Sequence, residues 1–196
     1  MSNDVPHLIL ASESLRRQEL LRDAGYLFDV QPPNVDESEH PETLGPVQLA
    51  RHLSLLKAAA ISPQFPDHIV LAADTVVAFG ERALGKPADS IEARRMLSLL
   101  SGTTHVVITG VTVIRHATGF QQTRHAMSAV RMRKLTVQEI QDYVASRQWE
   151  GKAGGYGIQD HDPFVVNVAG SHTNIVGLPM ELAAEMLAAA GIPPSN

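Results

Sequence analysis

The sequence contains no cysteine, and this absence alone excludes several kinds of chemistry. Disulfide bonds, thiolate nucleophiles and cysteine-ligated zinc sites all require a thiol that the chain does not have. The nine histidines show no H-x-x-x-H spacing, so no histidine-based metal site is predicted. Carboxylates, lysines, arginines and hydroxyl groups are left as the candidates for chemistry.

Long apolar runs and a positive net charge are absent as well. No apolar stretch approaches the ~20 residues that a transmembrane helix needs, and no basic segment followed by an apolar run and a cleavage site opens the chain. The net charge is -5, so a general attraction to nucleic acid or to an anionic membrane is not supported. We therefore expect a cytoplasmic protein without either kind of partner, in which phosphate is bound only locally.

Apolar runs of strand length alternate with helical patterns along the chain. Strands are predicted at residues 7–11, 28–31, 68–79, 105–114, 121–133 and 164–168. Helices are predicted at about residues 12–24, 47–61, 90–100, 136–147 and 179–191. The two long strands 105–114 and 121–133 are expected to pair antiparallel at the centre of the sheet. This order indicates an α/β fold with a mixed sheet, in one domain or two closely joined lobes.

Turn and cap residues mark several of these boundaries. Gly80 is expected to turn the strand 68–79 into a hairpin, and Ser90 is expected to cap the helix that follows. Thr136 and Glu139 have the spacing of a capping box. Pro179 is placed in the first turn of the last helix, where its missing N–H is tolerated.

The first anomaly lies where the strand 7–11 turns into a helix carrying Arg16 and Arg17 in its first turn. A cation at this end opposes the helix dipole and costs on the order of 0.3–1 kcal/mol. A phosphate bound there would remove the cost, accepting hydrogen bonds from both guanidinium groups and from free N–H groups, with Ser12 nearby. The alternative is that Ser14 is a plain N-cap and the arginines are solvated.

A second anomaly is a carboxylate, Asp74, inside the apolar run IVLAADTVVAF. Burying an unpaired charge is unfavourable, so such a residue is typically paired, metal-bound or shifted in pKa. The alternative is an aspartate that marks a strand end. Lys57 poses a similar question on the apolar helix 47–61, because most lysines of this kind extend to water.

Three loops carry further charged residues. Lys86 lies in GKP, and Lys152 opens the glycine-rich segment GKAGGYGIQ. Neither loop matches a Walker A motif. Asp36 and Glu37 lie in an acidic, proline-rich stretch and could supply a metal ligand, although these residues by themselves favour a solvated loop.

Taken together, these segments resemble the Maf-like nucleotide pyrophosphatases over nearly the whole chain. The matching blocks occur in the family's order and read LASESLRRQELL, VDE, LLKAAA, AADTVV, LGKPAD, LLSGTTHVVITGV, GKAGGYGIQ and NIVGLP. The resemblance implies a mixed, strongly twisted sheet with flanking helices and a central cleft, related to inosine-triphosphate pyrophosphatases. It also implies one domain over residues 1–196, with two lobes around the cleft, and a homodimer.

The resemblance implies hydrolysis of a nucleoside triphosphate to its monophosphate and pyrophosphate. Asp74 is expected to act as general base and, with Glu37, to bind Mg²⁺ or Mn²⁺. The residues expected to bind substrate or set specificity are Ser12, Arg16, Arg17, Lys57, Thr75, Lys86 and Gln159.

Two of these residues indicate a branch of the family. Thr75 and Gln159 resemble the branch that hydrolyses dTTP and UTP, whereas the branch favouring 7-methyl-GTP typically has Gln and Glu at these positions. A neutral amide can both donate to and accept from a uracil or thymine edge. Leu15 stands where the family usually has Pro, and Asp160 where Gly is usual. The alternatives are a pyrophosphatase for 7-methyl-GTP or other modified nucleotides, and a non-catalytic nucleotide-binding regulator of cell division.

Overall fold

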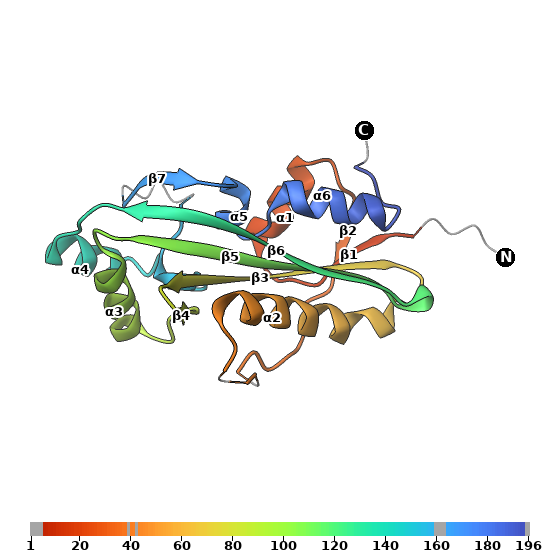
Figure 1. Ribbon diagram of the computed structural model, residues 1–196, viewed down its shortest axis with the longest axis horizontal. Helices are drawn as coiled ribbons and strands as arrows, with labels where there is room; N and C mark the ends of the chain where they lie inside the picture. The colour runs from red at the N-terminus through yellow and green to blue at the C-terminus, as the bar shows by residue number, and fades with distance from the viewer. Residues whose placement is uncertain (1–5, 39, 42, 159–163, 195–196) are drawn as a thin grey trace.

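The computed structural model describes residues 6–38, 40–41, 43–158 and 164–194. Its sheet has seven strands in the order β2-β1-β3-β5-β6-β7, with β4 paired to β3 (Figure 1). The strands are β1 (Leu8–Leu10), β2 (Phe28–Val30), β3 (Ile69–Phe79), β4 (Arg82–Leu84), β5 (Thr104–Arg115), β6 (Phe120–Met132) and β7 (Val165–Ala169). The α-helices are α1 (Leu15–Asp23), α2 (Pro46–Ile61), α3 (Ser90–Leu100), α4 (Val137–Ala145), α5 (His172–Val176) and α6 (Met180–Ala189).

The sheet is mixed, as predicted. β1 pairs in parallel with β2 and β3, whereas β3, β4, β5, β6 and β7 pair antiparallel. β5 and β6 form the expected long hairpin, but the centre of the sheet is shared by β3 and β5. β7 lies beyond β6 and continues the sheet there, pairing with its C-terminal end.

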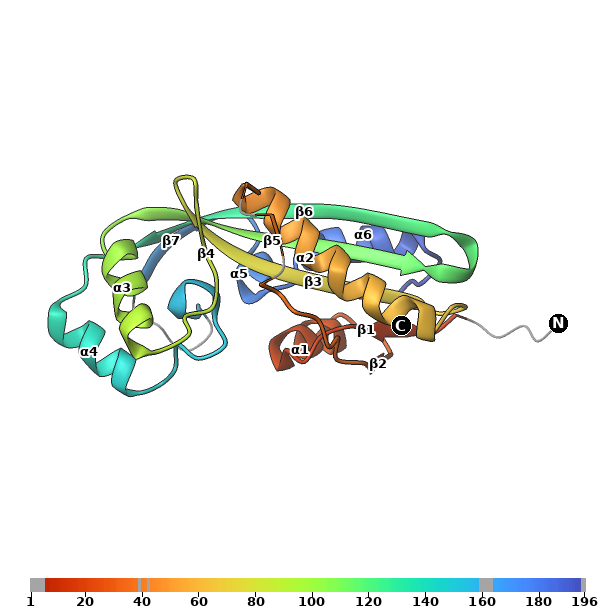
Figure 2. The same ribbon diagram turned by 90° about the horizontal axis from the view of Figure 1, so that it is seen from below.

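Helices cover both faces of the sheet because side chains alternate along each strand. Leu8 and Leu10 pack with α1 and α6 on one face, and Ile9 packs with α2 on the other. Figure 2 shows α2 lying across the long strands, and Figure 1 shows α1, α5 and α6 on the opposite side. A separate apolar cluster joins α3 and α4 to the far end of the strands. The two-lobed description of the single domain stays a prediction.

Helix caps explain most of the observed boundaries and correct one expectation. The capping box of Thr136 and Glu139 is present. Helix α3 is capped by Asp89 rather than by Ser90, because the Asp89 carboxylate accepts the Glu92 N–H at 2.8 Å. Pro179 is the N-cap residue of α6, just before the first turn. In the described ranges, no helix combines the length and apolarity that crossing a membrane requires.

Helix α2 lies so close to the sheet that one strand position has no room for a side chain. A Cβ atom at Gly110 of β5 would overlap the backbone carbonyl of Ala50 in α2. Because the obstacle is backbone rather than a flexible side chain, α2 as a whole would have to move. Gly110 therefore sets the approach of the helix that carries Lys57.

We expect Gly110→Ala to lower the free energy of unfolding by about 2–3 kcal/mol, the usual effect of overpacking a filled core. Urea unfolding measures the change. Gly85→Ala is the matched control, because a Cβ there meets nothing within 4 Å. Equal stability of the two variants would contradict the tight approach of α2.

Candidate active site

A cleft of about 440 Å³ opens beside the centre of β3. Its walls come from the N-terminus of α1, from α2, from the loop after β4 and from the glycine-rich loop after α4. The described residues of the predicted catalytic, metal and substrate-binding set all line it, namely Ser12, Arg16, Arg17, Glu37, Lys57, Asp74, Thr75 and Lys86. Asp36, the other acidic candidate, is not among the lining residues; its Oδ1 accepts from the backbone N–H and the hydroxyl of Ser38 at 2.8 and 2.6 Å. Gln159 and Asp160 lie outside the described residues. Lys152 also lines the cleft.

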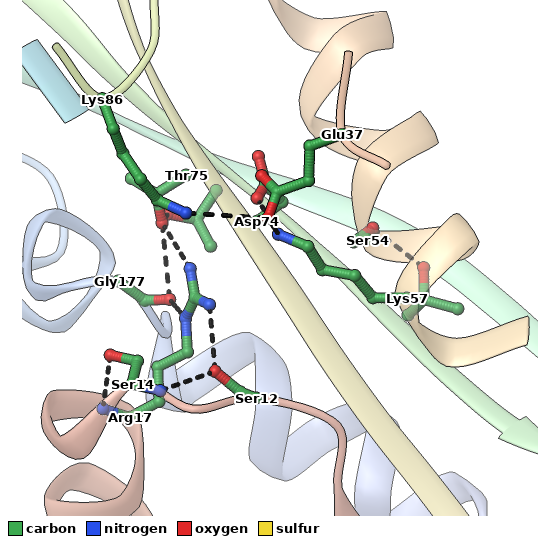
Figure 3. A network of polar contacts seen from close by, with 12 residues as sticks. Ser12, Ser14, Arg17, Glu37, Ser54, Lys57, Asp74, Thr75, Lys86 and Gly177 are labelled. Carbon is green, nitrogen blue, oxygen red and sulfur yellow. Dashed lines mark hydrogen bonds and ion pairs between the residues drawn. The ribbon is translucent and has the colours of Figure 1, made fainter. Parts of the chain in front are cut away.

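A chain of ion pairs joins four of these residues (Figure 3). Lys57 Nζ lies 2.5 Å from Asp74 Oδ1 and 3.1 Å from Glu37 Oε1. Lys86 Nζ reaches the same Glu37 oxygen at 3.6 Å. Asp74 and Lys57 are only 4% and 5% exposed, so the alternative of a lysine extending to water is wrong. Asp74 is a paired, buried carboxylate in the middle of its strand.

The same contacts set the ionisation of Glu37. Burial opposes its charged form, yet Lys57 and Lys86 together lower the pKa of this carboxyl below its ordinary value. Glu37 is therefore held as an anion at the mouth of the cleft. The acidic stretch that carries it is anchored by Lys57 and Lys86 rather than simply solvated.

Arg17 is fixed from three directions. Its Nε donates to the carbonyl oxygen of Gly177 at 2.8 Å, Nη1 to Ser12 Oγ at 3.2 Å, and Nη2 to Thr75 Oγ1 at 3.2 Å. Burial lowers the pKa of Arg17, and the nearby charge of Asp74 partly offsets this effect. The alternative of a solvated side chain is thus wrong for Arg17.

Arg16 lies nearer the rim. Its Nη2 donates to the carbonyl oxygen of Gly151 at 3.3 Å, and burial lowers its pKa. Ser14 is the N-cap of α1, accepting the Arg17 N–H, as the simpler interpretation had it. That cap coexists with a cleft lined by both arginines.

Sequence reasoning missed the backbone carbonyls of Gly151 and Gly177 that orient the two arginines. Every residue has a carbonyl, so no residue type could have marked them. Helix α5, which leads into Gly177, was also missed because five residues give too little helical periodicity. The block NIVGLP covers this segment and was the available signal.

The donor set suits a magnesium-type cation. Asp74 and Glu37 both contact the Lys57 ammonium group, and each uses one carboxylate oxygen for that contact. Mg²⁺ is typically held by one or two carboxylates together with waters and substrate phosphates. Within the described ranges no group of three or more acidic or histidine side chains gathers. Asp74 and Glu37 are the predicted ligands and could hold such an ion.

The glycine-rich loop is anchored at two points. Gly154 N–H donates to the Gly85 carbonyl at 2.9 Å, which ties the loop to the segment carrying Lys86. Tyr156 meets buried His105 of β5, with 2.5 Å between the hydroxyl oxygen and Nε2. Burial lowers the pKa of His105 to about 4.

A mixed sheet with helices on both faces, holding an acidic pair among lysines and arginines, defines an α/β protein with a cation-lined cleft. Its fold resembles that of a HAM1 protein from Coxiella burnetii, with a TM-score of 0.52 at 19% identity over 94% of this chain and 100% of that one. The predicted fold class is thereby confirmed.

The chain belongs to the Maf-like protein family, whose sequence profile matches residues 7–190. It is 47% identical over 188 residues to a dTTP/UTP pyrophosphatase of Cereibacter sphaeroides, covering 95% of this chain and 96% of the relative. A dTTP/UTP pyrophosphatase of Moorella thermoacetica is 43% identical over 186 residues, covering 94% and 95% of the two chains. The resemblance stated from the sequence motifs is confirmed.

Removing Lys57 should test how strongly the fold depends on the buried pair. We expect Lys57→Met to lower the free energy of unfolding by about 3–5 kcal/mol, because it leaves the Asp74 charge buried without its partner. Lys86→Met is the control. Because the Lys86 side chain is 54% exposed, this substitution should lower the free energy of unfolding by under about 1 kcal/mol. Adding Asp74→Asn to Lys57→Met should restore part of the loss, and no recovery would contradict the pairing.

His105 should make stability depend on pH. The pKa of His105 is about 4 in the folded chain against an ordinary 6.5, so its stabilisation is complete above pH 6.5 and is lost as the pH falls towards 4. Between pH 7 and pH 4, this effect should lower the free energy of unfolding, measured with urea, by about 3 kcal/mol. His105→Gln should flatten this slope, whereas the exposed-site variant His116→Gln should keep it.

Proposed function

We propose that the protein hydrolyses dTTP and UTP to the nucleoside monophosphate and pyrophosphate. The observation that carries the proposal is the buried Asp74 carboxylate in the wall of a cleft whose described lining includes five cationic side chains, Arg16, Arg17, Lys57, Lys86 and Lys152. The chain as a whole carries a net charge of -5, so these cations are concentrated locally. Relatives at 47% and 43% identity named dTTP/UTP pyrophosphatase support the substrate.

Two groups of cationic side chains are proposed to bind the triphosphate in different ways. Arg16 and Lys86 lie near the rim, where each can turn from its present acceptor to a phosphate oxygen. Arg17 and Lys57 are fixed deeper and supply positive charge without moving. Preorganised charges of this kind stabilise the developing charge of phosphoryl transfer.

Asp74 is the proposed general base, orienting the attacking water and accepting its proton. Lys57 contacts one carboxylate oxygen of Asp74, so the other oxygen is the one proposed to accept the proton. Asp74 and Glu37 would hold the Mg²⁺ or Mn²⁺ ion, which neutralises phosphate charge and acidifies bound water. The proposal includes a cytoplasmic homodimer, on the family resemblance.

Specificity for pyrimidines is proposed to depend on Arg16, Thr75 and Gln159. Thr75 lines the cleft and accepts a hydrogen bond from Arg17. The alternatives, a pyrophosphatase for 7-methyl-GTP or a regulator that binds nucleotide without turnover, make different predictions for the same assay.

The decisive experiment incubates the protein with a panel of nucleoside triphosphates and Mg²⁺ and separates the products. We expect dTTP and UTP to give monophosphate and pyrophosphate, and Asp74→Asn to lower kcat by about 10²-fold or more through loss of the base. Asp29→Asn, an exposed strand carboxylate on β2, is the matched control and should retain full activity.

Other outcomes would contradict distinct parts of the proposal. Release of orthophosphate and a diphosphate would mean that a different bond is cut. Preference for 7-methyl-GTP would overturn the pyrimidine assignment. Tight nucleotide binding without metal-dependent turnover would favour the regulator.

A further inference from the structure

We propose that Thr109, a buried residue of β5 behind the cleft wall, is a positioning residue that sets the guanidinium of Arg17 through Thr75. Thr109 is 0% exposed. Its hydroxyl lies 3.0 Å from that of Thr75 and 3.0 Å from the carbonyl oxygen of Asn174. Thr75 in turn accepts from Arg17 Nη2 at 3.2 Å. These hydrogen bonds connect Thr109, inside the sheet, to Arg17, in the cleft.

The direction of each hydrogen bond follows from the groups involved. A carbonyl oxygen can only accept, so the single hydroxyl proton of Thr109 is given to Asn174. Thr75 must then donate its own proton to Thr109. Thr75 could donate instead to the Gly177 carbonyl, but that contact is longer, at 3.5 Å against the 3.0 Å to Thr109.

This direction fixes what Thr75 offers to the cleft. With its proton directed inward, the Thr75 hydroxyl presents only lone pairs on the side of Arg17. A hydroxyl free to rotate could turn its hydrogen towards the guanidinium, which would repel it. Thr109 therefore keeps Thr75 in the acceptor orientation, and Arg17 is held by three acceptors rather than two.

The last residue in this series of hydrogen bonds, Asn174, is itself held in place by the sheet. The Asn174 side chain is fully buried, and its Nδ2 donates to the Val107 carbonyl at 3.0 Å and to Ser128 Oγ at 2.9 Å. Asn174 is thereby tied to both β5 and β6. The carbonyl that takes the Thr109 proton is fixed by the sheet itself.

The role in turnover rests on the proposed function, because it assumes that Arg17 serves the nucleotide phosphates. The positioning of Arg17 is a property of the folded chain and can be measured without substrate. The experiment therefore has two readouts: kcat/KM for dTTP, and the exchange with water of the Arg17 Nε–H, observed by ¹⁵N NMR.

Thr109→Val removes the hydroxyl while keeping the shape, and Thr109→Ser keeps the hydroxyl. We expect Thr109→Val to lower kcat/KM about tenfold, since it weakens a hydrogen bond to a charged group, and to speed exchange of the Arg17 Nε–H. Thr109→Ser should restore both readouts towards the original values. Thr75→Val combined with Thr109→Val should lose no more activity than Thr75→Val alone, because both act through one contact.

Thr112→Val is the matched control. Thr112 is an equally buried threonine of β5, 0% exposed, whose hydroxyl contacts Ser54 and Thr123 instead of the cleft residues. It should leave kcat/KM and the Arg17 signal unchanged in the folded protein. The same loss in Thr112→Val, or additive losses in the double variant, would overturn the proposal.

The two hypotheses fail differently. If the unmodified protein turns over no nucleoside triphosphate, the proposed function fails while the Arg17 exchange still reports on Thr109. If turnover is present but Thr109→Val changes neither readout, the positioning role alone is overturned.

Discussion

The buried ion pair between Lys57 and Asp74 is the interaction on which the rest of the cleft depends. Removing each charge from water costs several kcal/mol, so neither could stay at about 5% exposure without the other. The pair forms only where α2 lies against the sheet, and Gly110 permits that close approach. Lys57 then attracts Glu37, which also brings Lys86 to the mouth of the cleft. The ion pairs of the cleft therefore depend on the close packing of α2 against the sheet.

The arginines are held by a different means, namely neutral acceptors. Backbone carbonyls of Gly151 and Gly177 and the hydroxyls of Ser12 and Thr75 satisfy their donors. Neutral acceptors orient a guanidinium without cancelling its charge, so the charge stays available to an anion. A carboxylate partner would orient Arg17 as well but would neutralise it. The orientation is fixed when the chain folds, before any ligand arrives.

The sequence predicted most elements because their periodicity and caps are local, as with Thr136 and Glu139. Asp74 could be found because a carboxylate inside an apolar strand conflicts with burial. Lys57 was ambiguous for the opposite reason: a lysine on an apolar helix normally reaches water, and only the tertiary fold places Asp74 opposite it. The carbonyl of Gly177, the short helix α5 and the cap at Asp89 depend on backbone geometry that residue types do not specify.

The contacts also separate fixed cations from movable ones, and this division explains how a cleft can contain carboxylates and still accept a polyanion. Lys57 is buried on Asp74 at 2.5 Å, so transferring it to a phosphate would leave the Asp74 charge uncompensated. Lys86 meets Glu37 at 3.6 Å with its side chain 54% exposed, and releasing it costs little. Arg16 gives up one neutral acceptor at 3.3 Å. In the proposed function, a phosphate therefore recruits Lys86 and Arg16 while Lys57 holds the Asp74 carboxylate in place to accept a proton from water.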